Sequence, residues 1–162
     1  MRAMIFLDRR GLDQVVAQLL LLMVSLAVLS LALSIVVPVM DQYSSQNRIK
    51  EAEALIMTLY NEILKVQEEP PGSRRSIELG INRGGLELVN NPPSIVSYVD
   101  VRKKVEMEVQ GMDFSYTAKG AMLRKRLALP LLRRVFIGPG SNRVTITKTQ
   151  DRKLNVTVEL YA

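Results

Sequence analysis

Side chains with catalytic potential are scarce in this sequence, which has no histidine, no cysteine and no tryptophan among its 162 residues. Their absence excludes thiol nucleophiles, disulfides, Cys/His zinc sites and histidine acid-base catalysis. The remaining acid-base candidates are neighbouring carboxylates, at Glu68-Glu69 and at Glu106 and Glu108. Such pairs catalyse only in a cleft, and their spacing is equally typical of a helix end or an exposed strand. We therefore expect no enzyme activity, no metal site and no cofactor.

Five cations gather within residues 123–137, at Arg124, Lys125, Arg126, Arg133 and Arg134. Clustered cations can bind phosphates, as nucleic-acid-binding proteins do. Long cationic side chains also cover the solvated face of a strand. Because no aromatic residue interrupts either cluster to stack on bases, the sequence disfavours nucleic acid as a partner.

A candidate modification site lies close to the C-terminal end of the sequence. Asn155-Val156-Thr157 is the only N-x-Ser/Thr pattern in the given sequence. Alternating polar and apolar residues predict that Asn155 lies on the polar face of a strand. The sequence therefore makes Asn155 a candidate for N-glycosylation if this part of the chain is extracellular.

The element that places these groups relative to a membrane is an uncharged, strongly apolar run over residues 15–40. As a helix it is about 39 Å long, which exceeds the roughly 30 Å hydrocarbon core of a bilayer. Arg2, Arg9 and Arg10 precede the run and outweigh Asp8, so the positive-inside rule predicts a cytoplasmic N-terminus and an external C-terminal part. An ordinary cleaved secretory signal fits less well, because its apolar region is shorter and ends in a small-x-small site.

A short motif, Arg9-Arg10-Gly11-Leu12, stands directly before Asp13, Gln14 and this apolar helix. It resembles the class III signal peptide of type IV pilin-like proteins, archaeal ones in particular. The resemblance implies that a prepilin-type peptidase cleaves after Gly11, leaves the apolar helix on the mature subunit and makes Leu12 its first residue. Glycine resists helix continuation, which agrees with an extended scissile bond at the membrane surface.

One departure from the bacterial pattern limits this resemblance. Bacterial pilins typically carry Glu at the fifth mature position, where this sequence has Val16, and the nearby acid is Asp13 at mature position two. The head-to-tail charge pairing of bacterial pilins is therefore not transferred to this chain. The competing interpretation is a plain signal anchor, in which the two arginines only set the topology.

Helical periodicity continues beyond the apolar run into a polar region. Apolar residues follow a 3-4 spacing at Ile49, Ala52, Ile56, Leu59, Ile63 and Val66. The segment Pro70-Pro71-Gly72 then predicts the end of the helix. Within the apolar run, Ala27, Ser30 and Ser34 place small residues on or near one face, which favours close helix-helix packing.

Residues 70–162 show strand-like alternation in place of the helical period. Residues 77–81 and 86–88, joined by a turn at 82–85, predict a hairpin. Residues 95–101 and 104–110 predict two more strands. Residues 144–149 and 154–160 predict a closing hairpin around a turn at 150–153. We expect one small, mostly antiparallel sheet on the amphipathic helix.

These observations predict an α+β protein in four parts: a leader at 1–11, a transmembrane and filament-core helix at 12–40, an amphipathic extension at 41–69 and an extracellular β-rich head domain at 70–162. The resemblance implies a pilin-like subunit whose partners are the membrane, the peptidase and copies of itself or other pilins. It would assemble into a surface filament for adhesion or motility, as a major or minor subunit. The alternatives are a bitopic membrane protein that never polymerises, such as an envelope or filament-stator component, and a membrane-tethered hydrolase, which the sequence disfavours because it contains no nucleophile-base pair.

Overall fold

The computed structural model describes residues 9–109, 111–118 and 120–161, with side chains described from Asp13 onward. The described part begins with one helix, α1 (Arg9–Glu68), and continues as β-strands. It divides into two compact units, Met1–Asp41 and Gln42–Ala162, so α1 contributes to both. The structure confirms the α+β class, with a helix packed on a β domain.

The first unit contains the apolar half of α1. Its large apolar side chains from Val15 to Met40 are exposed, and Leu21, for example, is 71% exposed. Among the described residues, α1 is long and apolar enough to cross a membrane. The helix continues through Pro38.

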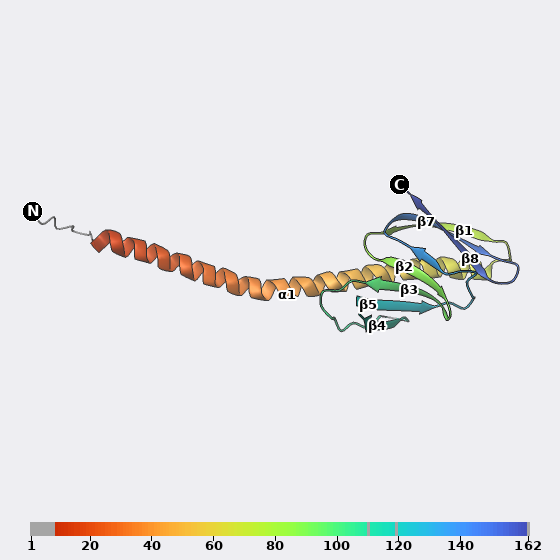
Figure 1. Cartoon of the computed structure of the whole chain (residues 1–162), viewed down its shortest axis with the longest axis horizontal. Helices are drawn as coiled ribbons and strands as arrows, with labels where there is room; N and C mark the ends of the chain where they lie inside the picture. The colour runs from red at the N-terminus through yellow and green to blue at the C-terminus, as the bar shows by residue number, and fades with distance from the viewer. Residues whose placement is uncertain (1–8, 110, 119, 162) are drawn as a thin grey trace, which may run out of the picture. The chain divides into compact units, whose positions relative to one another are not determined.

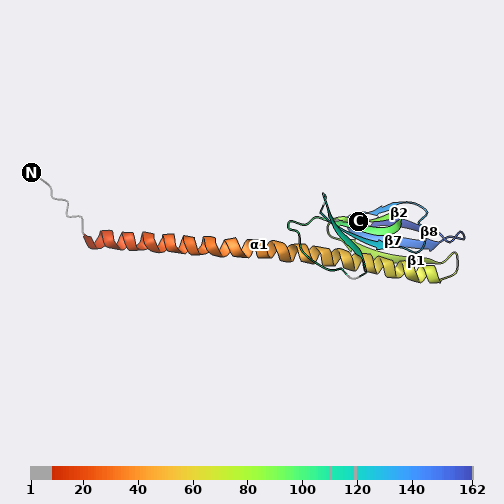
Figure 2. The same cartoon turned by 90° about the horizontal axis from the view of Figure 1, so that it is seen from below.

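The second unit is built around the amphipathic half of α1. All six residues of the predicted stripe are buried, at Ile49, Ala52, Ile56, Leu59, Ile63 and Val66. They join the strand residues in one hydrophobic core. Figure 2 shows this part of the helix, in yellow, running along one side of the strands. The 3-4 spacing therefore predicted the buried helix face correctly.

Two antiparallel sheets, rather than one, cover the helix (Figure 1). The three-stranded sheet has the order β1-β7-β8, with β1 at Arg74–Ile81, β7 at Gly140–Lys148 and β8 at Leu154–Tyr161. The five-stranded sheet has the order β4-β5-β3-β2-β6, with β2 at Gly85–Asn90, β3 at Pro93–Val99, β4 at Asp113–Thr117, β5 at Gly120–Arg126 and β6 at Val135–Ile137.

The predicted hairpin of residues 77–81 with 86–88 is wrong. β1 pairs with β7 along its whole length, from Arg74 opposite Thr147 to Ile81 opposite Gly140. β2 instead pairs with β3 and β6 in the other sheet. Alternation predicts which side chains face the core but not which strand is the neighbour, so both arrangements fit the same pattern.

The strand predicted at residues 104–110 is also wrong over the part that the structure describes, because residues 104–109 form no strand. Val105 and Val109 are nevertheless buried, as the alternation required. The Tyr116 hydroxyl accepts a hydrogen bond from the Val105 N–H at 2.7 Å and donates one to the Val105 carbonyl at 2.8 Å. A tyrosine side chain thus satisfies backbone groups that a neighbouring strand would otherwise pair.

The closing hairpin is confirmed, since β7 and β8 are paired neighbours in register from Ser141 opposite Tyr161 to Lys148 opposite Leu154. Lys148 also fastens this hairpin to the helix. Its ammonium group donates to the Gln67 and Glu69 carbonyls, at 2.6 Å each. A cation at a helix C-terminus satisfies unpaired carbonyls and complements the helix dipole, so Lys148 caps α1 where the prolines end it.

Candidate functional site

The residues predicted for peptidase processing lie at the start of α1. The backbone of Arg9, Arg10, Gly11 and Leu12 is helical, whereas the helix was expected to begin at Leu12. Their side chains and residues 1–8 lie outside the part that the structure describes. The first four N–H groups of a helix have no intrahelical acceptor, so its first turn opens at the lowest cost. The Gly11–Leu12 bond lies in that turn and needs only local unwinding to become extended.

The residues predicted for helix packing are all exposed in the first unit. The Ser34 hydroxyl donates to the Leu31 carbonyl at 2.8 Å, and the Ser25 hydroxyl donates to the Leu21 carbonyl at the same distance. These hydroxyls are therefore satisfied within their own helix. The case for packing rests on the small size of Ala27, Ser30 and Ser34, which lets another helix approach closely.

Asn155 lies in β8, opposite Thr147 of β7. Its neighbours Leu154 and Val156 are buried, whereas Asn155 and Thr157 are only half-buried. The two polar residues of the sequon thus share the outer face of the three-stranded sheet, as the alternation predicted. β8 is an edge strand of that sheet.

The structure separates the five cations of residues 123–137 into two groups. Arg124, Lys125 and Arg126 belong to β5, whereas Arg134 directly precedes β6, and β3 and β2 lie between these two strands. Most of these cations have local partners. Lys125 lies over the Tyr60 ring, 4.8 Å from its centroid, and Arg126 pairs with Asp113 at 3.5 Å.

The third contact joins Arg134 to Glu87. Arg134 forms an ion pair with Glu87, and this hydrogen bond raises the pKa of Arg134 above its ordinary value. The guanidinium remains charged at any working pH, and its side chain is 71% exposed to solvent. A phosphate ligand would compete with Glu87 for this cation.

The candidate acid pairs lie in different surroundings. Glu69 accepts two hydrogen bonds from Arg75, at 2.8 and 2.6 Å. Glu106 and Glu108 are exposed in the segment between β3 and β4. Within the described residues, no group of three or more acidic, histidine or cysteine side chains could hold a metal ion.

A cavity that the sequence analysis missed lies in the second unit, with a volume of about 550 Å³. We call it the helix-loop cavity. Its polar walls come from α1, from the 82–85 loop and from the end of β3, and include Arg48, Glu51, Asn82, Arg83, Tyr98 and Asp100. Asn82 and Arg83 had been assigned only to a turn, and no local pattern connects them to residues of the helix or of β3.

Two hydrogen bonds hold the walls of the helix-loop cavity together. The Asn82 amide donates to the Glu51 carboxylate at 2.8 Å, and the Arg48 guanidinium donates to the Asp100 carbonyl at 3.0 Å. Gly84 has φ +79°, and a Cβ there would lie 2.9 Å from the Tyr98 carbonyl oxygen. Only glycine allows the loop to lie this close to β3 in this conformation.

Comparison with protein-family models, curated proteins and solved structures finds no match for this chain.

Proposed function

We propose that this protein is a pilin-like subunit, cleaved after Gly11 by a prepilin-type peptidase and assembled into a surface filament for adhesion or motility. In this proposal it is a structural protein without enzymatic activity or cofactor. Its N-terminus starts in the cytoplasm, and residues 42–162 lie outside the cell.

The observation that carries the proposal is the contrast within α1. The helix offers a continuous set of exposed apolar side chains up to Met40, and from Ile49 onward the core of the second unit buries its apolar stripe. A filament subunit needs both properties. The apolar half must exchange lipid for neighbouring helices, and the other half must carry a folded head.

The proposed mechanism of assembly is physical. In the bilayer, hydrocarbon surrounds the exposed side chains of residues 15–40. In the filament, other subunits would replace lipid around these side chains, and close packing at small residues would supply the attraction. Cleavage after Gly11 would also remove Arg9 and Arg10, two charges that are costly to move through a bilayer.

A second candidate is a bitopic membrane protein that does not polymerise. The internal hydrogen bonds of Ser25 and Ser34 support it, because they leave these hydroxyls satisfied in lipid without a partner helix. In this case residues 15–40 act only as an anchor.

The N-terminal sequence of the mature protein, combined with mechanical shearing of producing cells, tests the proposal. We expect a mature protein that begins at Leu12 and is present in the sheared fraction as filaments. A protein that begins at Met1 contradicts the processing step. A protein cleaved after Gly11 that never enters the sheared fraction contradicts the filament and favours the bitopic protein.

A further inference from the structure

The helix-loop cavity has the size of a ligand site, and hydrogen bonds join its walls. Its volume of about 550 Å³ falls within the range of roughly 300–1,000 Å³ that is typical of small-molecule sites. The bonds from Asn82 to Glu51 and from Arg48 to the Asp100 carbonyl connect three separate segments around it. A ligand would therefore find its polar partners already positioned, which lowers the entropic cost of binding.

The charges that line this cavity balance. Arg48 and Arg83 contribute two positive charges, and Glu51 and Asp100 contribute two negative charges. A polyanion would meet two carboxylates and a cation would meet two guanidinium groups. A wholly apolar ligand would remove water from all four charges without replacing its hydrogen bonds. The complementary ligand is uncharged and rich in hydrogen-bonding groups.

Donors and acceptors both lie around the same space. The arginines and the Asn82 amide donate, and the carboxylates accept. Part of the wall is apolar, with Ala52, Leu55 and Leu86 among its residues. A sugar ring combines hydroxyl groups, each a donor and an acceptor, with an apolar C–H face, so it matches both kinds of wall.

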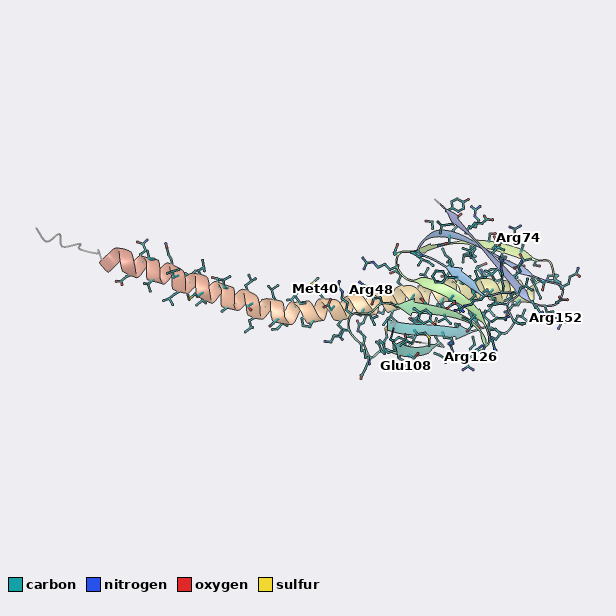
Figure 3. The ribbon with its side chains drawn as sticks, viewed as in Figure 1. Met40, Arg48, Arg74, Glu108, Arg126 and Arg152 are labelled. Carbon is teal, nitrogen blue, oxygen red and sulfur yellow. The ribbon has the colours of Figure 1, made fainter. Side chains whose placement is uncertain are left out.

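We propose that the helix-loop cavity binds a neutral saccharide unit of a surface glycan. This inference deepens the proposed function and rests on its extracellular placement of residues 42–162, where it would make the subunit itself adhesive. In Figure 3, Arg48 at one end of this unit is far from Arg152 at the other. The site is thus separate from the hollow of similar volume formed by residues 67–71, 128–129, 148 and 152.

Binding of the detergent-solubilised full chain to immobilised polysaccharides tests the proposal without requiring polymerisation. The probes are mannan, galactan and dextran as neutral polymers, with dextran sulfate as the anionic counterpart of dextran. We expect binding to at least one neutral polymer and weaker binding to dextran sulfate. Arg83→Ala and Glu51→Gln should each weaken neutral binding about tenfold or more, because each removes charged hydrogen-bonding capacity.

Glu51→Gln keeps the size of the side chain and an oxygen that can accept from Asn82, so it guards against loss of folding. Arg133→Ala is the matched control, since it removes an arginine that is also exposed but does not line the cavity. Circular dichroism must show that all three variants keep the wild-type β signal.

Three results would overturn the proposal: no binding to any neutral polymer, a preference for dextran sulfate, or equal weakening by Arg133→Ala. If neutral polymers do not bind and the cavity variants instead reduce sheared filaments, the cavity is a contact between copies of the chain. Failure of the filament proposal would be visible separately, in the mature N-terminus and the sheared fraction.

Discussion

The two halves of α1 use similar apolar residues in opposite ways. Leu31 in the first half is 66% exposed, whereas Leu59 in the second half is fully buried. The first half is apolar on every side, which suits a surrounding of lipid or of other helices. The second half is apolar on one face only, and the sheets of the second unit cover that face. The arrangement of apolar residues around the helix, and not their number, distinguishes the two environments.

The largest expected effect comes from blocking the processing step that would release the first half. Gly11→Val places a β-branched side chain beside the scissile bond, where it hinders both unwinding and access. We expect complete loss of cleavage and a full-length precursor in the membrane. Mass spectrometry of the membrane fraction measures this outcome, with Val16→Ala as a nearby control. Unchanged cleavage of Gly11→Val would contradict the pilin-type signal.

A matched pair of leucines tests the contrast directly. Leu59→Ala removes a fully buried side chain and should lower the free energy of unfolding by about 2–5 kcal/mol. Leu26→Ala changes an exposed residue of the same helix and should leave the unfolding of residues 42–162 unchanged. Urea denaturation of the full chain in micelles, followed by the β-sheet circular dichroism signal, compares the two. Equal effects would mean that the two halves are not independent.

A change confined to the first half should affect assembly without affecting the fold. Ala27→Leu combined with Ser34→Leu keeps the helix compatible with lipid but makes a face too bulky for close packing. We expect normal insertion and Gly11 cleavage, with several-fold less protein in the sheared surface fraction. The ratio of membrane-bound to sheared protein measures this change. An unchanged ratio would show that this face does not pack in the filament core.

The smallest expected effect concerns the junction of helix and sheet. Lys148→Met keeps an apolar stem but removes the two hydrogen bonds to the Gln67 and Glu69 carbonyls. We expect a loss of about 1–3 kcal/mol in unfolding free energy, with faster amide exchange near the end of α1. Lys153→Met, in the exposed turn that follows, is the control. Equal exchange rates in both variants would show that the Lys148 cap does not stabilise the helix end.

The correct strand predictions depended only on local sequence patterns, whereas the incorrect ones also depended on which segment is the hydrogen-bonding partner. The hairpin of β7 and β8 was predictable because both strands alternate clearly and a short polar turn joins them. The pairing of β1 with β7 was not, since these strands lie far apart in sequence and alternation carries no information about the partner. The burial of Val105 was predictable, because alternation shows which side chains face the core. The absence of a strand there was not predictable, because alternation does not show what the backbone bonds to. The backbone partner of Val105 is the hydroxyl of Tyr116, a side chain 11 residues away that no local pattern connects to it.

The candidate sites also divide into one that a local motif predicts and one that depends on the fold. Arg9, Arg10 and Gly11 form a motif that is local, so the sequence alone sufficed to propose it. The helix-loop cavity could not be proposed from the sequence, because Arg48, Arg83 and Asp100 come from three segments that only the fold brings together.

The sequence by itself determined the membrane-capable helix, the buried stripe of its second half and the approximate positions of β1, β2, β3, β7 and β8, but not those of β4, β5 and β6. These features depend on periodicities of a few residues, which local backbone geometry sets. Only the tertiary structure decided that the strands form two sheets, that β1 joins β7 and that Lys148 caps the helix. These features depend on hydrogen bonds and packing between distant segments, for which many partners satisfy the same local pattern and the shared core selects one.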